Sequence, residues 1–175
     1  QFNAKNCTSM GNDKSPVFED CSQLTSLTIG ENVTSIPNYA FMGCSSLTSV
    51  TIPESATKIG KSAFGGCSSL TSVQFNAKDC ASMGDYGFPV FDNCTQLTSL
   101  TIGENVTSIP YYAFYGCSGI TSITIPKSVT VIGDFAFRGC SSLTSVTIPE
   151  SVTMIGFWAF EDCSSLRNIT IPESV

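Results

Sequence analysis

Cysteine is the residue with the most obvious chemical potential in this chain, and it recurs at a regular interval. Seven of the nine cysteines are spaced 23 residues apart, with a single step of 27: Cys21, Cys44, Cys67, Cys94, Cys117, Cys140 and Cys163. A zinc site needs converging ligands, commonly in Cys-x₂-Cys pairs, and the chain has no His to complete a set. We therefore predict no metal site at these cysteines.

Disulfides are the second interpretation of the periodic cysteines. Stacked units would bring equivalent Cα atoms within bridging distance, but their Cα–Cβ vectors would run nearly parallel, which is poor disulfide geometry. The third interpretation, which we favour, is a small buried apolar residue at a fixed position. Cys7 and Cys80 lie outside the series, and their redox state is left open.

Carboxylates form a second periodic set. One turn position repeatedly holds Glu: Glu31, Glu54, Glu104, Glu150 and Glu173. Carboxylate oxygens attract calcium, but a turn beside water also favours polar residues, and Lys127 interrupts the column. The column therefore predicts a solvated turn, and no metal or other cofactor.

Catalysis is not indicated. The absence of His excludes Ser–His and Cys–His nucleophiles, and Gly30-Glu31-Asn32 and Gly103-Glu104-Asn105 look like turns, not phosphate-binding loops. The net charge of −6, with only 8 Lys and Arg, argues against a nucleic-acid partner. No apolar run approaches the roughly 18 residues of a membrane span, so we expect no membrane insertion.

The periodic residues belong to a repeated unit. A typical unit, residues 140–162, reads "CSSLTSVTIPESVTMIGFWAFED". Its apolar positions are Cys140, Leu143, Val146, Ile148, Val152, Ile155, Ala159 and Phe160. A longer period is superimposed, because residues 1–73 align with 74–146 without a gap and most positions are identical. Internal repetition of this length predicts a solenoid.

The unit resembles the bacterial BspA-like (treponemal-type) leucine-rich repeat family, whose motif is I-P-x-x-V-x-x-I-G-x-x-A-F-x-x-C-x-x-L. The resemblance implies an α/β repeat solenoid: a right-handed coil with a short-stranded parallel sheet on the concave face and short helical or 3₁₀ turns opposite. Residues 1–175 would form one domain of about seven coils, with longer units at 1–20 and 67–93. The motif is lost at 1–20 and 74–93, where we expect local bulges.

Stacking follows from the pattern itself. Val146-Thr147-Ile148 alternates like a strand, and Pro149 ends it because proline lacks a backbone N–H. One 23-residue unit cannot enclose its apolar face, so neighbouring units must bury it for each other. The outward strand positions then form a hydroxyl-rich face, a weaker binding candidate: Thr28, Thr51, Thr101, Thr124, Thr147 and Thr170.

The variable positions before Ala-Phe are the stronger candidate. They hold extra aromatic residues: Tyr39, Tyr111, Tyr112, Phe135, Phe157 and Trp158. Repeat spacing predicts that Tyr112, Phe135 and Trp158 stack as consecutive rungs. Exposed aromatic patches mark interaction sites, although packing as a second apolar layer is an open alternative.

By resemblance, the function expected is non-enzymatic binding by a bacterial cell-surface or secreted protein, such as adhesion. The partners implied are a host or matrix protein, another cell-surface protein, or a glycan. The alternatives are a structural spacer without a ligand, and a weaker one, a cation-dependent self-associating module. The chain begins and ends inside repeat units, which suggests a fragment of a longer protein.

Overall fold

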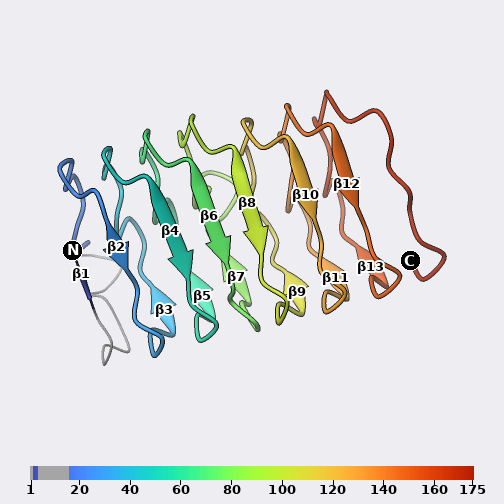
Figure 1. Cartoon of the computed structure of the whole chain (residues 1–175), viewed down its shortest axis with the longest axis horizontal. Helices are drawn as coiled ribbons and strands as arrows, with labels where there is room; N and C mark the ends of the chain where they lie inside the picture. The colour runs from blue at the N-terminus through green and yellow to red at the C-terminus, as the bar shows by residue number, and fades with distance from the viewer. Residues whose placement is uncertain (1, 4–15) are drawn as a thin grey trace.

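The computed structural model describes residues 2–3 and 16–175, which form a stack of similar coils in a parallel-strand solenoid (Figure 1). Cys7 and most of the long unit at 1–20 lie outside the described residues. The N- and C-terminal coils lie at opposite ends of the stack (Figure 1). Six successive coils, from β2–β3 to β12–β13, each contribute two strands and a series of turns.

One set of strands, most of them three or four residues long and called the long strands below, lines one side of the solenoid. They are β1 (Phe2–Asn3), β2 (Leu27–Thr28), β4 (Ser49–Ile52), β6 (Ser72–Phe75), β8 (Ser99–Ile102), β10 (Ser122–Thr124) and β12 (Ser145–Thr147). They pair in parallel, as β1-β2, β4-β6-β8 and β10-β12. The pairing keeps repeat register, with Val50 opposite Val73 and Val73 opposite Leu100. In β4, Val50 and Ile52 are buried while Ser49 and Thr51 are exposed, which confirms the alternation expected from the sequence.

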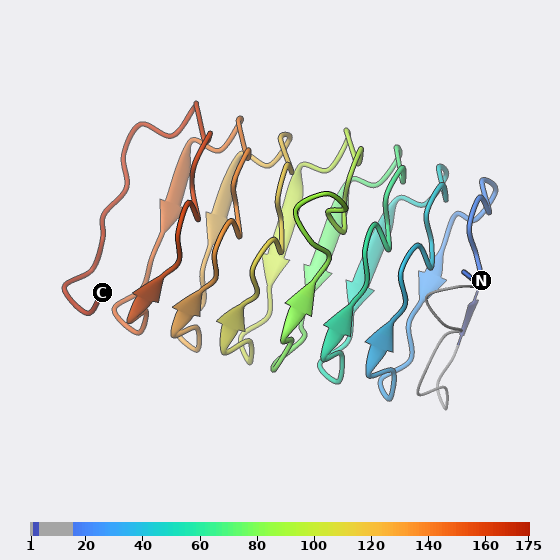
Figure 2. The same ribbon diagram turned by 180° about the vertical axis from the view of Figure 1, so that it is seen from behind.

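A second set of strands, which the sequence analysis missed, lies in the next part of each coil (Figure 2). These are β3 (Ser35–Ile36), β5 (Lys58–Ile59), β7 (Ser82–Met83), β9 (Ser108–Ile109), β11 (Val131–Ile132) and β13 (Met154–Ile155). They pair in parallel as β3-β5-β7 and β9-β11-β13. Each is two residues long, so the sequence offers almost no alternation by which to predict it.

The expectation of helical or 3₁₀ turns was wrong, because the described residues contain no helix. The segment containing Ala-Phe forms successive turns in which every second N–H group donates to a carbonyl of the next coil. Tyr39 N–H donates to the Lys61 carbonyl, and Phe41 N–H to the Ala63 carbonyl, both at 2.8 Å. An N–H committed to a neighbouring coil cannot close an α-helical bond along its own chain.

Phenylalanine forms the centre of the core. Seven rings stack from coil to coil: Phe18, Phe41, Phe64, Phe91, Phe114, Phe137 and Phe160. The Phe41–Phe64 centroids are 5.3 Å apart and the Phe91–Phe114 centroids 6.1 Å. The planes of Phe91 and Phe114 differ by only 6°. This ladder, together with the aliphatic residues of the strands, fills the interior.

The periodic cysteines are free thiols, and six of the seven are buried, as we predicted for this set. They have a further role, because thiols donate to the backbone of the preceding coil. The Cys67 Sγ lies 3.3 Å from the Phe41 carbonyl oxygen, and the Cys94 Sγ 3.1 Å from that of Phe64. The prediction fails for Cys21, which is exposed.

Burial changes the acidity of these thiols. Desolvation raises the pKa of Cys44 to about 11 and that of Cys94 to about 12. Cys80, whose redox state the sequence left open, is a buried free thiol with its pKa raised to about 11 by the same cause. Each thiol is therefore neutral at physiological pH and a poor nucleophile.

Serine and threonine hydroxyls explain part of the unusual composition, because they link adjacent coils. A serine in the turn after β4, β10 and β12 donates to the valine carbonyl of the coil before it. Examples are Ser55 to Val33 at 2.7 Å and Ser151 to Val129 at 2.8 Å. These hydroxyls therefore contribute to stacking.

Candidate functional site

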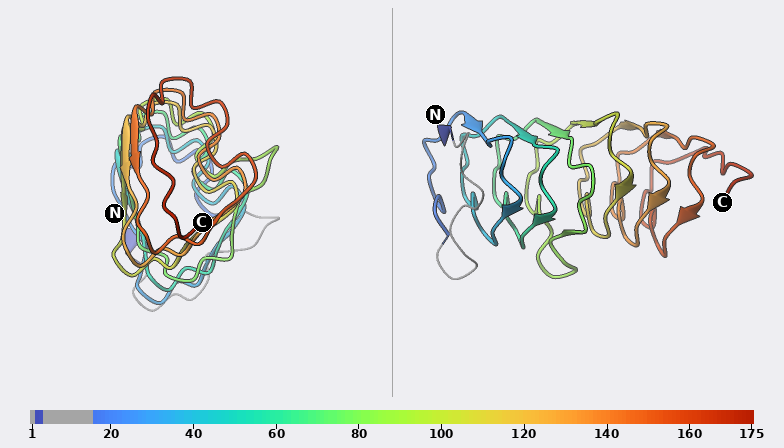
Figure 3. Two further views of the ribbon diagram at one scale, coloured as in Figure 1. Left: turned by 90° about the vertical axis from the view of Figure 1, so that its right-hand side faces the viewer. Right: turned by 90° about the horizontal axis from the view of Figure 1, so that it is seen from below.

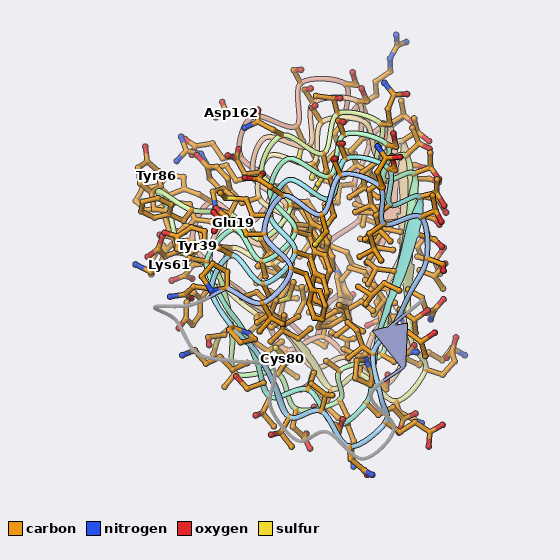
Figure 4. All side chains as sticks on the ribbon, turned by 90° about the vertical axis from the view of Figure 1, so that its left-hand side faces the viewer. Glu19, Tyr39, Lys61, Cys80, Tyr86 and Asp162 are labelled. Carbon is orange, nitrogen blue, oxygen red and sulfur yellow. The ribbon has the colours of Figure 1, made fainter. Side chains whose placement is uncertain are left out.

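The aromatic candidates lie on the side of the solenoid away from the long strands. We call this surface the aromatic ridge and define it by Tyr39, Tyr86, Phe88, Tyr111, Tyr112, Tyr115, Phe135, Phe157 and Trp158. Figure 4 shows Tyr39 and Tyr86 on the edge of the coil opposite the strands, whereas Cys80 lies inside. All five tyrosines and the only tryptophan of the chain belong to this ridge.

The backbone of the ridge is unusual. The position directly before Ala-Phe has positive φ at Tyr39 (58°), Ser62 (42°), Tyr112 (56°), Phe135 (57°) and Trp158 (53°). A bulky residue in this left-handed region costs roughly 1–2 kcal/mol, and glycine or asparagine would relieve most of that cost. A second left-handed position, before each Cys, holds only the residues that tolerate it, namely Gly, Asp or Asn. The aromatic residues therefore occupy the first position against local conformational preference.

The rings stack as the repeat spacing predicted. The centroids of Tyr112 and Phe135 are 4.8 Å apart, and those of Phe135 and Trp158 are 5.2 Å apart. Tyr111 and Phe157 flank the stack with edge or tilted contacts to Tyr112 and Trp158. Phe157 is 74% exposed and Trp158 58%, so packing as a buried second layer does not describe them.

The long unit at 67–93 forms a loop that completes the ridge. The expected bulge is present: Asp85 and Phe88 pair as an antiparallel bridge, and the loop projects from the coil opposite the long strands (Figure 3, left). The loop tip carries Tyr86, which contacts Tyr112 at 6.5 Å and Tyr115 at 6.0 Å between centroids. The loop thus adds aromatic side chains between the coil of Tyr112 and that of Ser62, which has no aromatic residue at its left-handed position and whose N–H donates to the Phe88 carbonyl at 3.2 Å.

A salt bridge fixes the base of this loop. The Lys61 Nζ lies 2.7 Å from the Asp85 Oδ2 and 5.4 Å from the centroid of Phe88. Phe88 in turn meets Tyr39 edge to face at 6.2 Å. The ridge is therefore continuous from Tyr39 past the loop to Trp158.

A second cation lies further along the ridge. The Arg138 guanidinium is 5.7 Å from the centroid of Phe135 and 5.9 Å from that of Tyr115. Its Nε lies 2.8 Å from the Glu161 Oε2. A shallow groove of about 290 Å³ is lined by Tyr86, Phe135, Arg138, Trp158 and Glu161.

The tyrosine at the centre of the ridge is held neutral. Desolvation, followed by the nearby carboxylates of Asp134 and Asp85, raises the pKa of Tyr112. Its hydroxyl is therefore a hydrogen-bond donor across the physiological range.

Sequence reasoning found six of the nine ridge residues and missed Tyr86, Phe88 and Tyr115, together with the adjoining Arg138. Tyr115 and Arg138 had a signal, since both follow Ala-Phe at a position that varies from unit to unit. Tyr86 and Phe88 had a weaker one, the extra length of the unit at 67–93. Which rings that loop would reach depends on its path, and the sequence does not determine that path.

The two weaker candidates are also located. All six threonines of the outward strand face are exposed: Thr28, Thr51, Thr101, Thr124, Thr147 and Thr170. A wider hollow of about 960 Å³ adjoins Thr28 and Thr51 and includes Glu31 and Glu54. Within residues 2–3 and 16–175, no group of three His, Cys, Asp or Glu could hold a metal ion.

The fold defines a class, the leucine-rich repeat solenoids. Residues 12–89 and 87–175 match the family described as BspA type leucine rich repeat region, in six copies. The match covers nearly the whole chain, and the chain belongs to this family. No curated protein matches the sequence.

Three solved structures are similar to the chain. A leucine-rich repeat protein from Bacteroides ovatus is 22% identical over 93% of this chain and 48% of its own, with a TM-score of 0.63. A leucine rich cell surface protein from Faecalibacterium prausnitzii is 26% identical over 92% of this chain and 59% of its own, with a TM-score of 0.55. The leucine rich repeat protein of T. pallidum is 25% identical over 78% and 72%, with a TM-score of 0.57.

The chain spans about half the length of the Bacteroides ovatus structure. Among the described residues, no helix is long and apolar enough to cross a membrane.

Proposed function

We propose that this solenoid is a non-enzymatic binding module of a bacterial cell-surface or secreted protein, and that it binds a protein or glycan partner through the aromatic ridge. Adhesion to a host or matrix protein, or to another cell surface, is the role that fits best. The single observation that carries the proposal is the stack of Tyr112, Phe135 and Trp158, in which Tyr112 and Phe135 are partly buried and Trp158 is exposed. The name of the Faecalibacterium prausnitzii relative, a cell surface protein, supports the extracellular location.

Two physical arguments favour a binding role for these rings. Tyr, Trp and Arg are the residues that most often dominate binding energy at protein interfaces, and the ridge concentrates all three types. The rings also occupy left-handed positions that glycine would adopt more easily. Strain of this kind is often retained at functional sites.

Stacking alone offers a competing account. Each aromatic pair contributes about 0.5–1.5 kcal/mol beyond its buried area, which is comparable to the backbone strain. The exposure of Phe157 and Trp158 argues against this account, because rings kept only for stability would be better buried.

A screen for partners tests the proposal. The chain is immobilised and probed with matrix proteins and with a glycan array, and each hit is repeated with a Tyr112→Ala/Phe135→Ala/Trp158→Ala variant. Circular dichroism and the melting temperature confirm that the variant is folded. We expect binding to weaken at least about tenfold, and unchanged binding by the folded variant would overturn the ridge assignment.

The threonine face provides the control. A Thr101→Ala/Thr124→Ala/Thr147→Ala variant alters the same number of positions on the opposite side of the coils, and we expect it to bind normally. If no partner binds the chain in any screen, the structural spacer becomes the better interpretation.

A further inference from the structure

The negative charge of the chain is concentrated on the side that carries the ridge. In each coil, this side is the segment that ends just before the periodic Cys: residues 17–20, 37–43, 60–66, 84–93, 110–116, 133–139 and 156–162. These segments contain two cations, Lys61 and Arg138, and seven carboxylates: Glu19, Asp20, Asp85, Asp92, Asp134, Glu161 and Asp162. The ridge side therefore carries five of the six net negative charges of the chain. Figure 4 shows Glu19 and Asp162 on the same edge as Tyr39 and Tyr86.

The ridge already accommodates cations in a repeated manner. Arg138 lies over the rings of Phe135 and Tyr115 and pairs with Glu161. Lys61 lies near the ring of Phe88 and pairs with Asp85. In both cases an aromatic ring and a carboxylate hold a cation together, an arrangement stabilised by the ring quadrupole and by the ion pair.

The orientation of the rings argues against a sugar as the main ligand. Pyranose rings bind proteins by lying flat on an open aromatic face. Tyr112 and Trp158 cover the two faces of Phe135, with planes inclined by 8° and 28°. Phe135 therefore presents its edge to a ligand, and the hydroxyls and carboxylates around it suit protein side chains better than a sugar ring.

We infer that the partner is a protein with a basic segment, whose Lys or Arg side chains enter the groove between Tyr86 and Trp158. There they pair with the carboxylates of Glu161 and Asp162, which they share with Arg138, whose Nε lies 2.8 Å from the Glu161 Oε2 and 3.4 Å from the Asp162 Oδ2. This inference rests on the proposed binding function of the ridge and names its partner class. Long-range attraction between the acidic ridge and the basic segment would speed association, and salt would weaken it.

Oligoarginine is the probe for the first test. Trp158 is the only tryptophan, so its fluorescence reports binding at the groove directly. A nine-residue oligoarginine peptide is titrated at low and at physiological salt, with oligoaspartate and a cello-oligosaccharide as comparison ligands. We expect only oligoarginine to change the emission, with an affinity that falls as salt rises.

Charge variants supply the matched comparison. Asp134→Asn/Glu161→Gln/Asp162→Asn removes three charges from the ridge, and Glu31→Gln/Glu104→Gln/Glu150→Gln removes three from the turns after the long strands. Oligoarginine affinity is expected to fall at least about tenfold in the ridge variant and less than about twofold in the turn variant.

The possible results distinguish a wrong partner class from a wrong ridge assignment. Equal weakening in both variants would overturn the inference, since net charge alone would then explain binding. Binding of the oligosaccharide but not oligoarginine at Trp158 would also overturn it, while leaving the ridge as a ligand site. Unchanged partner binding by the folded triple-alanine variant would instead overturn the proposed function.

Discussion

Tyr112 and Phe135 stack with their ring centroids 4.8 Å apart and their planes only 8° apart, although both residues have left-handed backbone conformations. Equivalent positions in adjacent coils share the same backbone geometry, so their side chains project in the same direction. Because the two residues occupy equivalent positions in the repeat, their rings lie parallel to each other. The free-energy cost of the left-handed backbone and the free-energy gain from ring stacking are of comparable size, and the two can be measured separately.

The free-energy cost of the left-handed backbone can be measured by itself at Phe135. Phe135→Gly and Phe135→Ala lose the same ring contacts, but only alanine keeps the cost of positive φ. We expect the glycine variant to be more stable than the alanine variant by about 1 kcal/mol in urea unfolding. The neighbouring Phe157, which has no positive φ, is the control, and there alanine should equal or exceed glycine. The same order at both positions would contradict the left-handed assignment.

Removing a ring from the core ladder should destabilise the protein far more than removing one from the ridge. Phe64 is fully buried and stacks between Phe41 at 5.3 Å and Phe91 at 5.7 Å. Phe64→Ala is expected to lower the free energy of unfolding by about 3–5 kcal/mol, because it leaves a cavity that the adjacent coils cannot close. Phe157→Ala removes the same group from a 74% exposed site and should cost far less. Similar losses in the two variants would show that the ladder is not the core.

Glycine is required where one coil presses on the next. A Cβ added at Gly133 would lie 2.6 Å from the Tyr111 backbone nitrogen, whereas one at Gly87 would meet nothing within 4 Å. Gly133→Ala should therefore destabilise the protein by about 1–3 kcal/mol, and Gly87→Ala by less than about 0.5 kcal/mol. Chemical denaturation of the two variants checks this difference. A neutral Gly133→Ala would mean that the coils are less closely packed than described.

Alkaline pH should unfold the protein through its buried thiols. Burial raises the pKa of Cys44 and Cys80 to about 11, so between pH 9 and 11 the folded state holds protons that the unfolded chain has released. The stability that these thiols contribute is complete below pH 9 and is lost as pH rises through their folded pKa values. Each such thiol steepens the fall by up to about 1.4 kcal/mol per pH unit.

Cys80→Ala provides the check on this pH dependence. Urea unfolding at several pH values from 8 to 11 should show a shallower decline in the variant than in the parent protein. A parent stability that stays constant over this range would contradict the burial of the thiols.

The repeat itself determined most of the fold. The positions of Val50 and Ile52 inside and of Thr51 outside, the burial of six periodic cysteines, and the stacking of Tyr112, Phe135 and Trp158 could all be predicted, because each follows from placing identical units side by side. In a repeat solenoid each coil contacts only the coils beside it. The spacing of 23 residues therefore predicts which residues lie next to each other.

The conformations inside one coil had to come from the tertiary structure. The segment around Tyr39 and Phe41 resembles a helical turn in sequence, yet the N–H groups of Tyr39 and Phe41 donate to the next coil. Two-residue strands such as β5 also form by bonding to neighbouring coils. The path of the loop at 84–88, which brings Tyr86 to Tyr112 and Asp85 to Lys61, likewise depends on contacts between coils. The repeat spacing specifies which residues of adjacent coils are neighbours. Which backbone N–H and C=O groups bond between coils, and therefore how each coil bends, is decided only when the coils pack together.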